Sequence, residues 1–367
     1  MTTSATTTRP TRDPWLDNAK MALVTLVVVG HTWTLLPLTA LHGHLYDFLY
    51  AWHIPAFVFV TGYLSRSFDW SRRRLWQLFC TVAVPYVIFE CALALFRVHV
   101  GGEDLDRLFA DPHWPMWYLA ALFFWRLLTP VFKNLPGGVV LAVGISLLAG
   151  LYAGDTLDIA RVLGLLPFFV LGLKATPERL ERLRSWPAQV AAVLALVAIW
   201  VATTWTDRWA STEWLYYRSR YDELGTSDVE AMVIRGVLLA VGLAGAWAFL
   251  ALVPRGGGWF ARMGAWTLVV YLFHGFAVKG AAYAGYDRWA AERPELALVL
   301  TTTVGVLLAL TLAWPPVATR LGHLVDPLGY AQHKVRAAVQ VAAAKGEADV
   351  FAGAIEDAAS RKLTYAR

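Results

Sequence analysis

The chain has 367 residues, of which 57% are hydrophobic and 16% are charged, and its formal net charge at pH 7 is +5. A water-soluble domain carries nearer a quarter charged residues and could not hide this much apolar surface. The composition therefore excludes an ordinary soluble enzyme. It predicts a membrane protein, and the 18 tryptophans fit an interfacial aromatic belt.

Apolar runs of about 15 to 25 residues, bounded by charges, proline or glycine, predict about ten transmembrane helices. In chain order we expect them at Asp17–Leu36, Tyr46–Leu64, Leu75–Phe96, Trp114–Phe132, Val139–Tyr152, Ile159–Leu173, Pro187–Thr206, Val229–Val253, Met263–Tyr283 and Glu295–Trp314. The predicted fold is all-α and polytopic. We expect a cytosolic N-terminal tail (residues 1–16), a transmembrane domain (17–318) and a cytosolic C-terminal tail (319–367).

The distribution of basic residues predicts the orientation of these helices. With the N-terminus inside, about two thirds of the 32 Lys and Arg residues lie on the cytoplasmic side. An even number of spans returns the C-terminus to that side, so we expect an N-in/C-in protein. The outer loops Gly101–Asp111 and Asp207–Asp228 are then long enough to contact a substrate.

The first span holds three ionisable residues, Asp17, Lys20 and His31. Such residues cost about 2.5–3.5 kcal/mol each in a membrane and normally face a cavity or a partner. Lys20 and His31 share one helix stripe about 16 Å apart, which places His31 near mid-membrane. A long anionic donor could lay its phosphates at Lys20 and present its reactive end to the imidazole, a good proton acceptor near neutral pH. The alternative is a histidine that only packs helices.

Other polar residues leave two interpretations open. Arg72–Arg74 match phosphates, or serve as topology signals and lipid contacts. His53 precedes a turn disturbed by Pro55, and it either satisfies a freed carbonyl or meets an acceptor. His274 has a supporting or gating role, or only packs.

Five further charged residues lie in or near the apolar spans. Glu90 and Arg126 pair with each other or with another helix, and the others are Arg161, Arg235 and Lys279. The sequence has no CxxC motif and no zinc-ligand pattern, so we expect no metal site.

Several short motifs resemble the integral-membrane acyltransferase-3 family. Lys20, ten residues and then His31 match the basic residue and histidine of that family's first helix. The segment from His53-Ile54-Pro55-Ala56-Phe57 through Thr61-Gly62-Tyr63-Leu64 resembles the second helix of fucose 4-O-acetylase-like members. Trp117-Tyr118-Leu119 and Tyr271-Leu272-Phe273-His274 occupy the places of further motifs. Together these motifs cover the chain from Asp17 to about Pro316.

The resemblance implies transfer of an acyl group, commonly acetyl, from cytosolic acyl-CoA to a hydroxyl of a glycan or a lipid-linked sugar. It implies His31 as the catalytic histidine, with Lys20 as its basic partner near the donor, in a multi-pass protein of a bacterial cytoplasmic membrane. We also expect Asp17, on the same helix stripe one turn below Lys20, to belong to the catalytic site. The family often has two arginines three apart at the start of its third helix, a spacing that the run here lacks. We expect the donor phosphates at Lys20, Arg72, Arg73 and Arg74, and the acceptor at His53, Trp117, Tyr118 and His274.

Two rival functions use the same residues. A secondary transporter or flippase would use the buried His, Glu and Arg side chains as a proton or substrate site, although the sequence shows no inverted repeat. A noncatalytic relative would bind acyl-CoA or scaffold an envelope assembly. A rise in melting temperature with acetyl-CoA, absent with a free sugar, would favour the enzyme.

Overall fold

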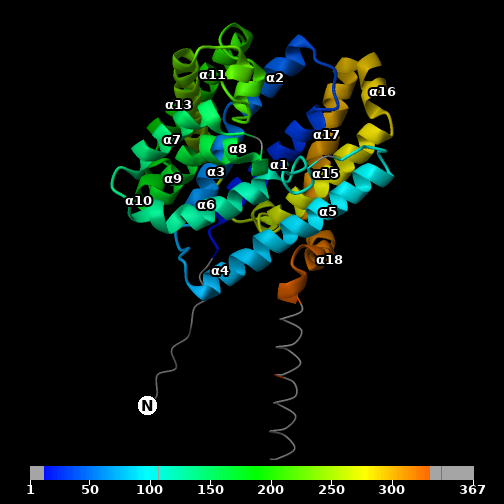
Figure 1. Cartoon of the computed structure of the whole chain (residues 1–367), viewed down its shortest axis with the longest axis horizontal. Coiled ribbons are helices and arrows are strands. Elements are labelled where there is room, and N and C mark those ends of the chain that lie inside the picture. Colours follow the sequence, from blue (N-terminus) through cyan, green and yellow to red (C-terminus); the bar gives the residue numbers. More distant parts are fainter. Residues whose placement is uncertain (1–11, 106, 155, 331–339, 341–367) are drawn as a thin grey trace, which may run out of the picture. The chain divides into compact units, whose positions relative to one another are not determined.

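The computed structural model of the protein describes residues 12–105, 107–154, 156–330 and 340. The expected tails lie largely outside these residues: residues 1–11 at one end, and 331–339 and 341–367 at the other. Within the described ranges every regular element is a helix, as predicted (Figure 1). Contacts divide the chain into two units, residues 1–322 and 323–367. The first unit carries the site.

All the longer helices but the last follow the predicted apolar runs in chain order. They are α1 (Pro14–Trp33), α2 (Ala40–Tyr50), α3 (His53–Leu64), α5 (Val84–His99), α6 (Trp117–Asn134), α7 (Gly138–Tyr152), α9 (Leu166–Lys174), α11 (Trp186–Thr203), α13 (Asp228–Leu252), α15 (Thr267–Tyr283), α17 (Pro294–Ala313) and α18 (Pro315–Val325). The shorter ones are α4 (Arg72–Leu78), η1 (Phe79–Ala83), η2 (Thr156–Asp158), α8 (Ile159–Gly164), α10 (Pro177–Arg182), η3 (Thr206–Arg208), α12 (Thr212–Leu215), η4 (Asp222–Leu224), α14 (Trp259–Met263) and α16 (Tyr286–Glu292).

Four described helical segments are long and apolar enough to cross a membrane: Arg72–His99, Trp186–Thr203, Asp228–Leu252 and Pro294–Ala313. The first of these runs through α4, the π-helical η1 and α5 as one continuous helix (Figure 1). Two bent pairs, α8 with α9 and α15 with α16, raise the number to six if each is one span. A helix or a broken pair lies at each of the ten predicted positions, but ten crossings and the N-in/C-in orientation stay predictions.

The first helix, α1, lies inside the bundle rather than at its edge. The Asp13 carboxylate caps it by accepting a hydrogen bond from the Trp15 amide at 3.0 Å, and Pro14 occupies the first turn, where its missing N–H costs nothing. The helix then packs against α2, α3, α14, α15 and α17. Most of its side chains are buried, so its polar residues face protein.

The predicted second span is broken into α2 and α3. The pyrrolidine ring of Pro55 would clash with the carbonyl of Ala51 in a continuous helix, and Pro55 cannot donate a backbone hydrogen bond. The chain therefore ends α2 at Tyr50 and restarts at His53, which places Pro55 in the first turn of α3. The break turns residues on either side of it toward the cavity described below.

Two glycines allow α3 and α9 to cross with their backbones in contact. A Cβ atom on Gly62 would lie 2.0 Å from the carbonyl oxygen of Phe169, and one on Gly172 would lie 1.9 Å from that of Phe59. Small residues of this kind are what membrane helices use to approach closely. The crossing fixes α3, one wall of both cavities, against the rest of the bundle.

Candidate active site

Two histidines from distant helices form the centre of the site. The Nδ1 atom of His31, near the end of α1, lies 2.8 Å from the Nε2 atom of His274, in α15. Both side chains are buried, with 6% and 0% of their surface exposed. The indole ring of Trp114 covers His31, with 4.4 Å between ring centroids.

The hydrogen bonds of the pair fix which ring nitrogens carry protons. The Nδ1 atom of His274 lies 3.1 Å from the carbonyl oxygen of Val270, which can only accept, so this nitrogen carries a proton. In a neutral ring, Nε2 of His274 is then an acceptor, and Nδ1 of His31 must donate to it. The Nε2 atom of His31 is left with a free lone pair. The geometry thus holds His31 in the tautomer that a general base requires.

His31 lines a cavity of about 360 Å³, here called the outer cavity. Its wall combines aromatic rings with hydrogen-bonding and charged groups: Tyr46, Tyr50, Trp114, Trp117, Arg161, Glu213, Tyr216 and Arg218. Sugars have apolar C–H faces and hydroxyl edges, so rings beside polar groups suit them. The size is that of an ordinary small-ligand site.

Arg161, from α8, contributes a guanidinium group to this wall. Its Nε atom lies 3.7 Å from the nearest Asp158 carboxylate oxygen, too far for a hydrogen bond, and has no other partner among the described residues. Its guanidinium carbon lies 4.9 Å from the centre of the Trp117 ring. Arg161 therefore brings a positive charge to the wall of the cavity that His31 also lines.

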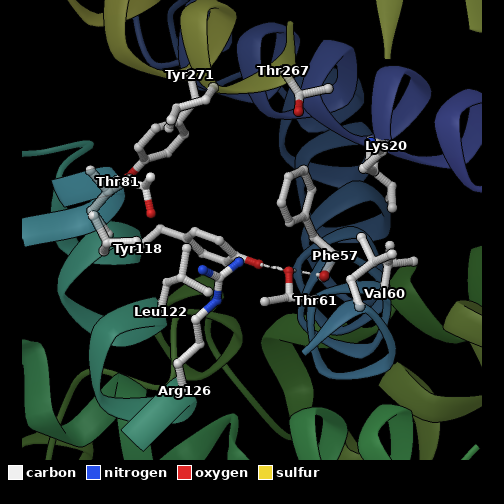
Figure 2. Close-up of a pocket in the computed structure, with 15 residues that line it drawn as sticks. Lys20, Phe57, Val60, Thr61, Thr81, Tyr118, Leu122, Arg126, Thr267 and Tyr271 are labelled. Atoms are coloured by element: carbon white, nitrogen blue, oxygen red, sulfur yellow. Dashed lines mark hydrogen bonds between the residues drawn. The ribbon is translucent and has the colours of Figure 1, made fainter. Parts of the chain in front are cut away.

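A second cavity of about 260 Å³, the inner cavity, lies further along the same helices (Figure 2). Lys20 and Arg126 are its cations, and much of its wall is apolar. Tyr118 lies beside Arg126 in this cavity (Figure 2), and its hydroxyl is 2.6 Å from the Thr61 hydroxyl. The π-helix η1 contributes Thr81 to the wall. Narrow apolar walls with cations suit the arm and phosphates of a long anionic donor.

The two cavities share three helices. On α1, Lys20 lines the inner cavity and His31 the outer one, about 16 Å apart along the axis. On α6 the adjacent residues Tyr118 and Trp117 line one cavity each, and α3 contributes to both walls. Tyr271 lines the inner cavity one helical turn before His274. The histidine pair therefore lies where the two cavities approach each other.

Two predicted site residues, Asp17 and His53, have other surroundings. Asp17 lies about 21 Å along α1 from His31 and pairs with Lys20 at 2.8 Å. The Nδ1 atom of His53 lies 2.7 Å from the carbonyl oxygen of Leu49, across the break between α2 and α3. This contact corresponds to the first of the two interpretations of His53, in which the imidazole satisfies a freed backbone carbonyl. Asp17 therefore orients the Lys20 ammonium and has no described contact with the base.

The arginine cluster and His274 also lie away from the cavity walls. Arg72, Arg73 and Arg74 are exposed at the start of α4, and none of them lines either cavity. His274 lines neither cavity and contacts His31 instead. Trp117 lines the outer cavity, whereas Lys20 and Tyr118 line the inner one, so Tyr118 lies apart from the other residues predicted for the acceptor.

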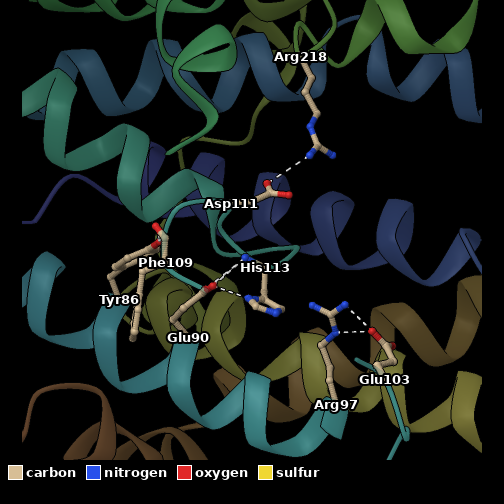
Figure 3. Close-up of polar contacts among 8 residues, drawn as sticks. All are labelled: Tyr86, Glu90, Arg97, Glu103, Phe109, Asp111, His113 and Arg218. Atoms are coloured by element: carbon tan, nitrogen blue, oxygen red, sulfur yellow. Dashed lines mark hydrogen bonds and ion pairs between the residues drawn. The ribbon is translucent and has the colours of Figure 1, made fainter. Parts of the chain in front are cut away.

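Polar contacts hold the chain segment before α6 (Figure 3), and Trp114 in this segment packs on His31. Glu90, fully buried in α5, accepts a hydrogen bond from the His113 amide at 2.9 Å and contacts the His113 ring. Glu90 therefore does not pair with Arg126. The Tyr271 hydroxyl donates to the carbonyl of Pro115. These anchors flank Trp114 and hold its ring against His31.

The same loop is anchored further out by Glu103. Partial burial opposes ionisation of this carboxyl, but hydrogen bonds from Arg97, Tyr283 and Lys279 outweigh it and lower its pKa to about 2. A carboxyl with a lowered pKa stabilises the fold above its ordinary value of 4.5 and loses that contribution as the pH falls through about 2. The anchor is therefore fully formed at physiological pH.

Sequence reasoning gave no role to Arg126 and Arg161. Both were visible as charges inside apolar runs, which mark functional sites by default. Trp114, Glu213 and Arg218 carry no such signal, because their part in the outer cavity depends on how the outer loops fold over α1 and α3.

The described residues thus form a helical bundle in which a buried histidine pair lies close to two cavities lined by the same helices. A protein-family model described as an acyltransferase domain matches residues 13–318, most of the chain. The chain belongs to the acyltransferase-3 family, and its function is that of an acyltransferase. No curated protein and no solved structure matches it.

Proposed function

We propose that the protein transfers an acyl group, acetyl in the simplest case, from cytosolic acyl-CoA to a hydroxyl of a glycan or lipid-linked sugar. The observation that carries this proposal is the His31–His274 pair between a cationic inner cavity and an aromatic, polar outer cavity. The donor enters the inner cavity with its phosphates at Lys20 and Arg126. The acceptor occupies the outer cavity.

The Nε2 atom of His31 takes the proton of the acceptor hydroxyl as its oxygen attacks the thioester carbonyl carbon. Arg161 lies on the wall where it can hold an oxygen of the acceptor or of the tetrahedral intermediate. The intermediate collapses, the C–S bond breaks, and the thiolate takes the proton back from the imidazolium. The products are the ester and free CoA, and no proton is gained or lost.

The test replaces His31 with Ala in the full-length protein. We expect acyl transfer to fall by about 10²- to 10⁴-fold, because the general base is lost. Transfer is measured as acetyl groups on envelope glycans by mass spectrometry, in cells expressing either variant. Thermal melting of the purified protein checks folding, and transfer at the wild-type rate would end the assignment.

Ligand binding separates this proposal from a transporter. The enzyme should melt at a higher temperature with acetyl-CoA, because a ligand that binds only the folded state stabilises it. A transporter of sugars should respond to the free sugar and not to acetyl-CoA. His31→Ala should keep the acetyl-CoA response, since the residue acts on the proton of the acceptor rather than on the donor phosphates.

A further inference from the structure

A groove runs along the outside of the bundle between α11 and α13, the two neighbouring helices that both qualify as membrane spans. It has a volume of about 560 Å³ and is separate from both cavities of the site. α11 exposes most of its apolar side chains, as a helix at the edge of a membrane bundle does. The groove therefore opens toward lipid.

The floor of the groove is made of alanine side chains on one face of each helix. Residues three or four apart share a face, so these alanines form two facing stripes about 10 Å long. They are Ala188, Ala192, Ala195, Ala244, Ala248 and Ala251. The length is about a third of the hydrocarbon core of a bilayer, which matches part of one acyl chain in one leaflet.

Two arginines stand at one end of the groove. Arg179 and Arg182, from α10, line it and are exposed, and neither forms an ion pair with a carboxylate of the described chain. Their neighbour Glu181 forms ion pairs with Arg184 and Arg255, with N–O distances of 3.1 and 2.9 Å. Trp247, 46% exposed, lies in the same wall, and tryptophan is the side chain that favours the membrane interface.

We propose that this groove binds an anionic phospholipid, with its phosphate at Arg179 and Arg182 and one acyl chain along the alanines. Guanidinium groups match phosphate oxygens in charge and geometry. The phosphate compensates two cations that have no other counter-ion in the described chain. An apolar groove at hydrocarbon depth, beside cations at its end, fits a lipid better than a soluble anion.

The test measures retention of lipid on the purified full-length protein by native mass spectrometry. Phosphatidylglycerol and phosphatidylcholine with the same acyl chains are added to the protein in neutral detergent. We expect the anionic lipid to bind more tightly. Arg179→Gln/Arg182→Gln should weaken its binding about 30-fold, roughly fivefold for each arginine near a membrane surface.

Two variants separate the groove from general surface charge. Arg72→Gln/Arg73→Gln removes the same charge from another exposed helix start and should leave retention unchanged. Ala244→Phe keeps both arginines but fills the groove at an exposed position, and it should abolish the preference for phosphatidylglycerol. Thermal melting verifies that each variant folds.

Three results would overturn the proposal. One is equal retention of the two lipids by the wild-type protein. Another is normal binding by Ala244→Phe, which would assign the effect to surface charge. The third is a lipid-free dimer that Ala244→Phe dissociates, since a second copy of the chain would then cover the groove.

Discussion

His31 and His274 are chemically identical side chains with different tasks because of one backbone carbonyl. The carbonyl of Val270 fixes the proton on His274, and that proton fixes the tautomer of His31. In a serine protease an aspartate holds the catalytic histidine in this way. Here a neutral imidazole does so, which suits a buried site because no second charge has to be desolvated.

Replacing His274 tests this division of tasks. His274→Ala removes the acceptor for the His31 Nδ1 proton, so we expect kcat to fall about 10- to 100-fold with little change in KM for the donor. His274→Gln keeps an acceptor oxygen and should recover part of the rate. Steady-state kinetics with acetyl-CoA gives both quantities. A residue that served packing alone would lower the melting temperature without this split between kcat and KM.

Arg126 provides a separate test of the donor site. Its guanidinium lines the inner cavity, so Arg126→Gln should raise KM for acetyl-CoA about tenfold, the cost of losing a hydrogen bond to a charged group. Arg72→Gln is the matched control at the exposed start of α4, and its KM should not change. The opposite pattern would return the donor phosphates to the arginine cluster.

For single residues, the sequence predicts the position along a helix but not the side chain that the residue contacts. Helix geometry alone places Lys20 and His31 on one stripe, and the two residues line the inner and outer cavities. The partner of His31 lies 243 residues away. Glu90 likewise meets the loop residue His113 rather than Arg126. Such pairs depend on how helices pack, which one sequence does not contain.

The helices themselves are more predictable than their interruptions. Apolar runs locate a helix at all ten expected positions, because each run has to satisfy its own backbone inside a membrane. The sequence also hints at the break before α3, since Pro55 disturbs the turn at His53. The 54° bend between α8 and α9 also has a proline beside it, since Pro167 lies in the first turn of α9.

The crossing of α3 and α9 makes a prediction at the scale of helices. Gly62→Ala and Gly172→Ala each place a methyl group about 2 Å from a backbone oxygen. We expect each to lower the free energy of unfolding by about 1–3 kcal/mol, since neither backbone can move away alone. Gly144→Ala in α7 is the control, because nothing lies within 4 Å of its added methyl group. Thermal melting should show no loss there, or a small gain from helix propensity.

The first unit has at its centre the helix α1, which packs against five other helices and lines both cavities. Which cavity faces the cytosol depends on the orientation of the chain in the membrane. The basic residues favour the N-in/C-in orientation. The family match supports a membrane protein without fixing that orientation. The exposed ends of the bundle are the place to measure it.

Orientation can be determined with single cysteines after Cys80 and Cys91 are replaced. Arg72→Cys should resist a membrane-impermeant maleimide in intact cells and react after the cells are opened. Glu223→Cys, at the other predicted face, should react in intact cells. Both residues are exposed. Reversed labelling would place the donor cavity on the outside, where acyl-CoA is not supplied.

The place of the histidine pair between the two cavities has a consequence for where the cell recovers the coenzyme and where the product forms. If each cavity opens to its own side, spent coenzyme returns to the cytosolic pool while the ester forms at the opposite face. The acyl group then crosses the membrane during the transfer reaction itself. On the proposed mechanism, no dedicated carrier for an activated acyl donor is then needed.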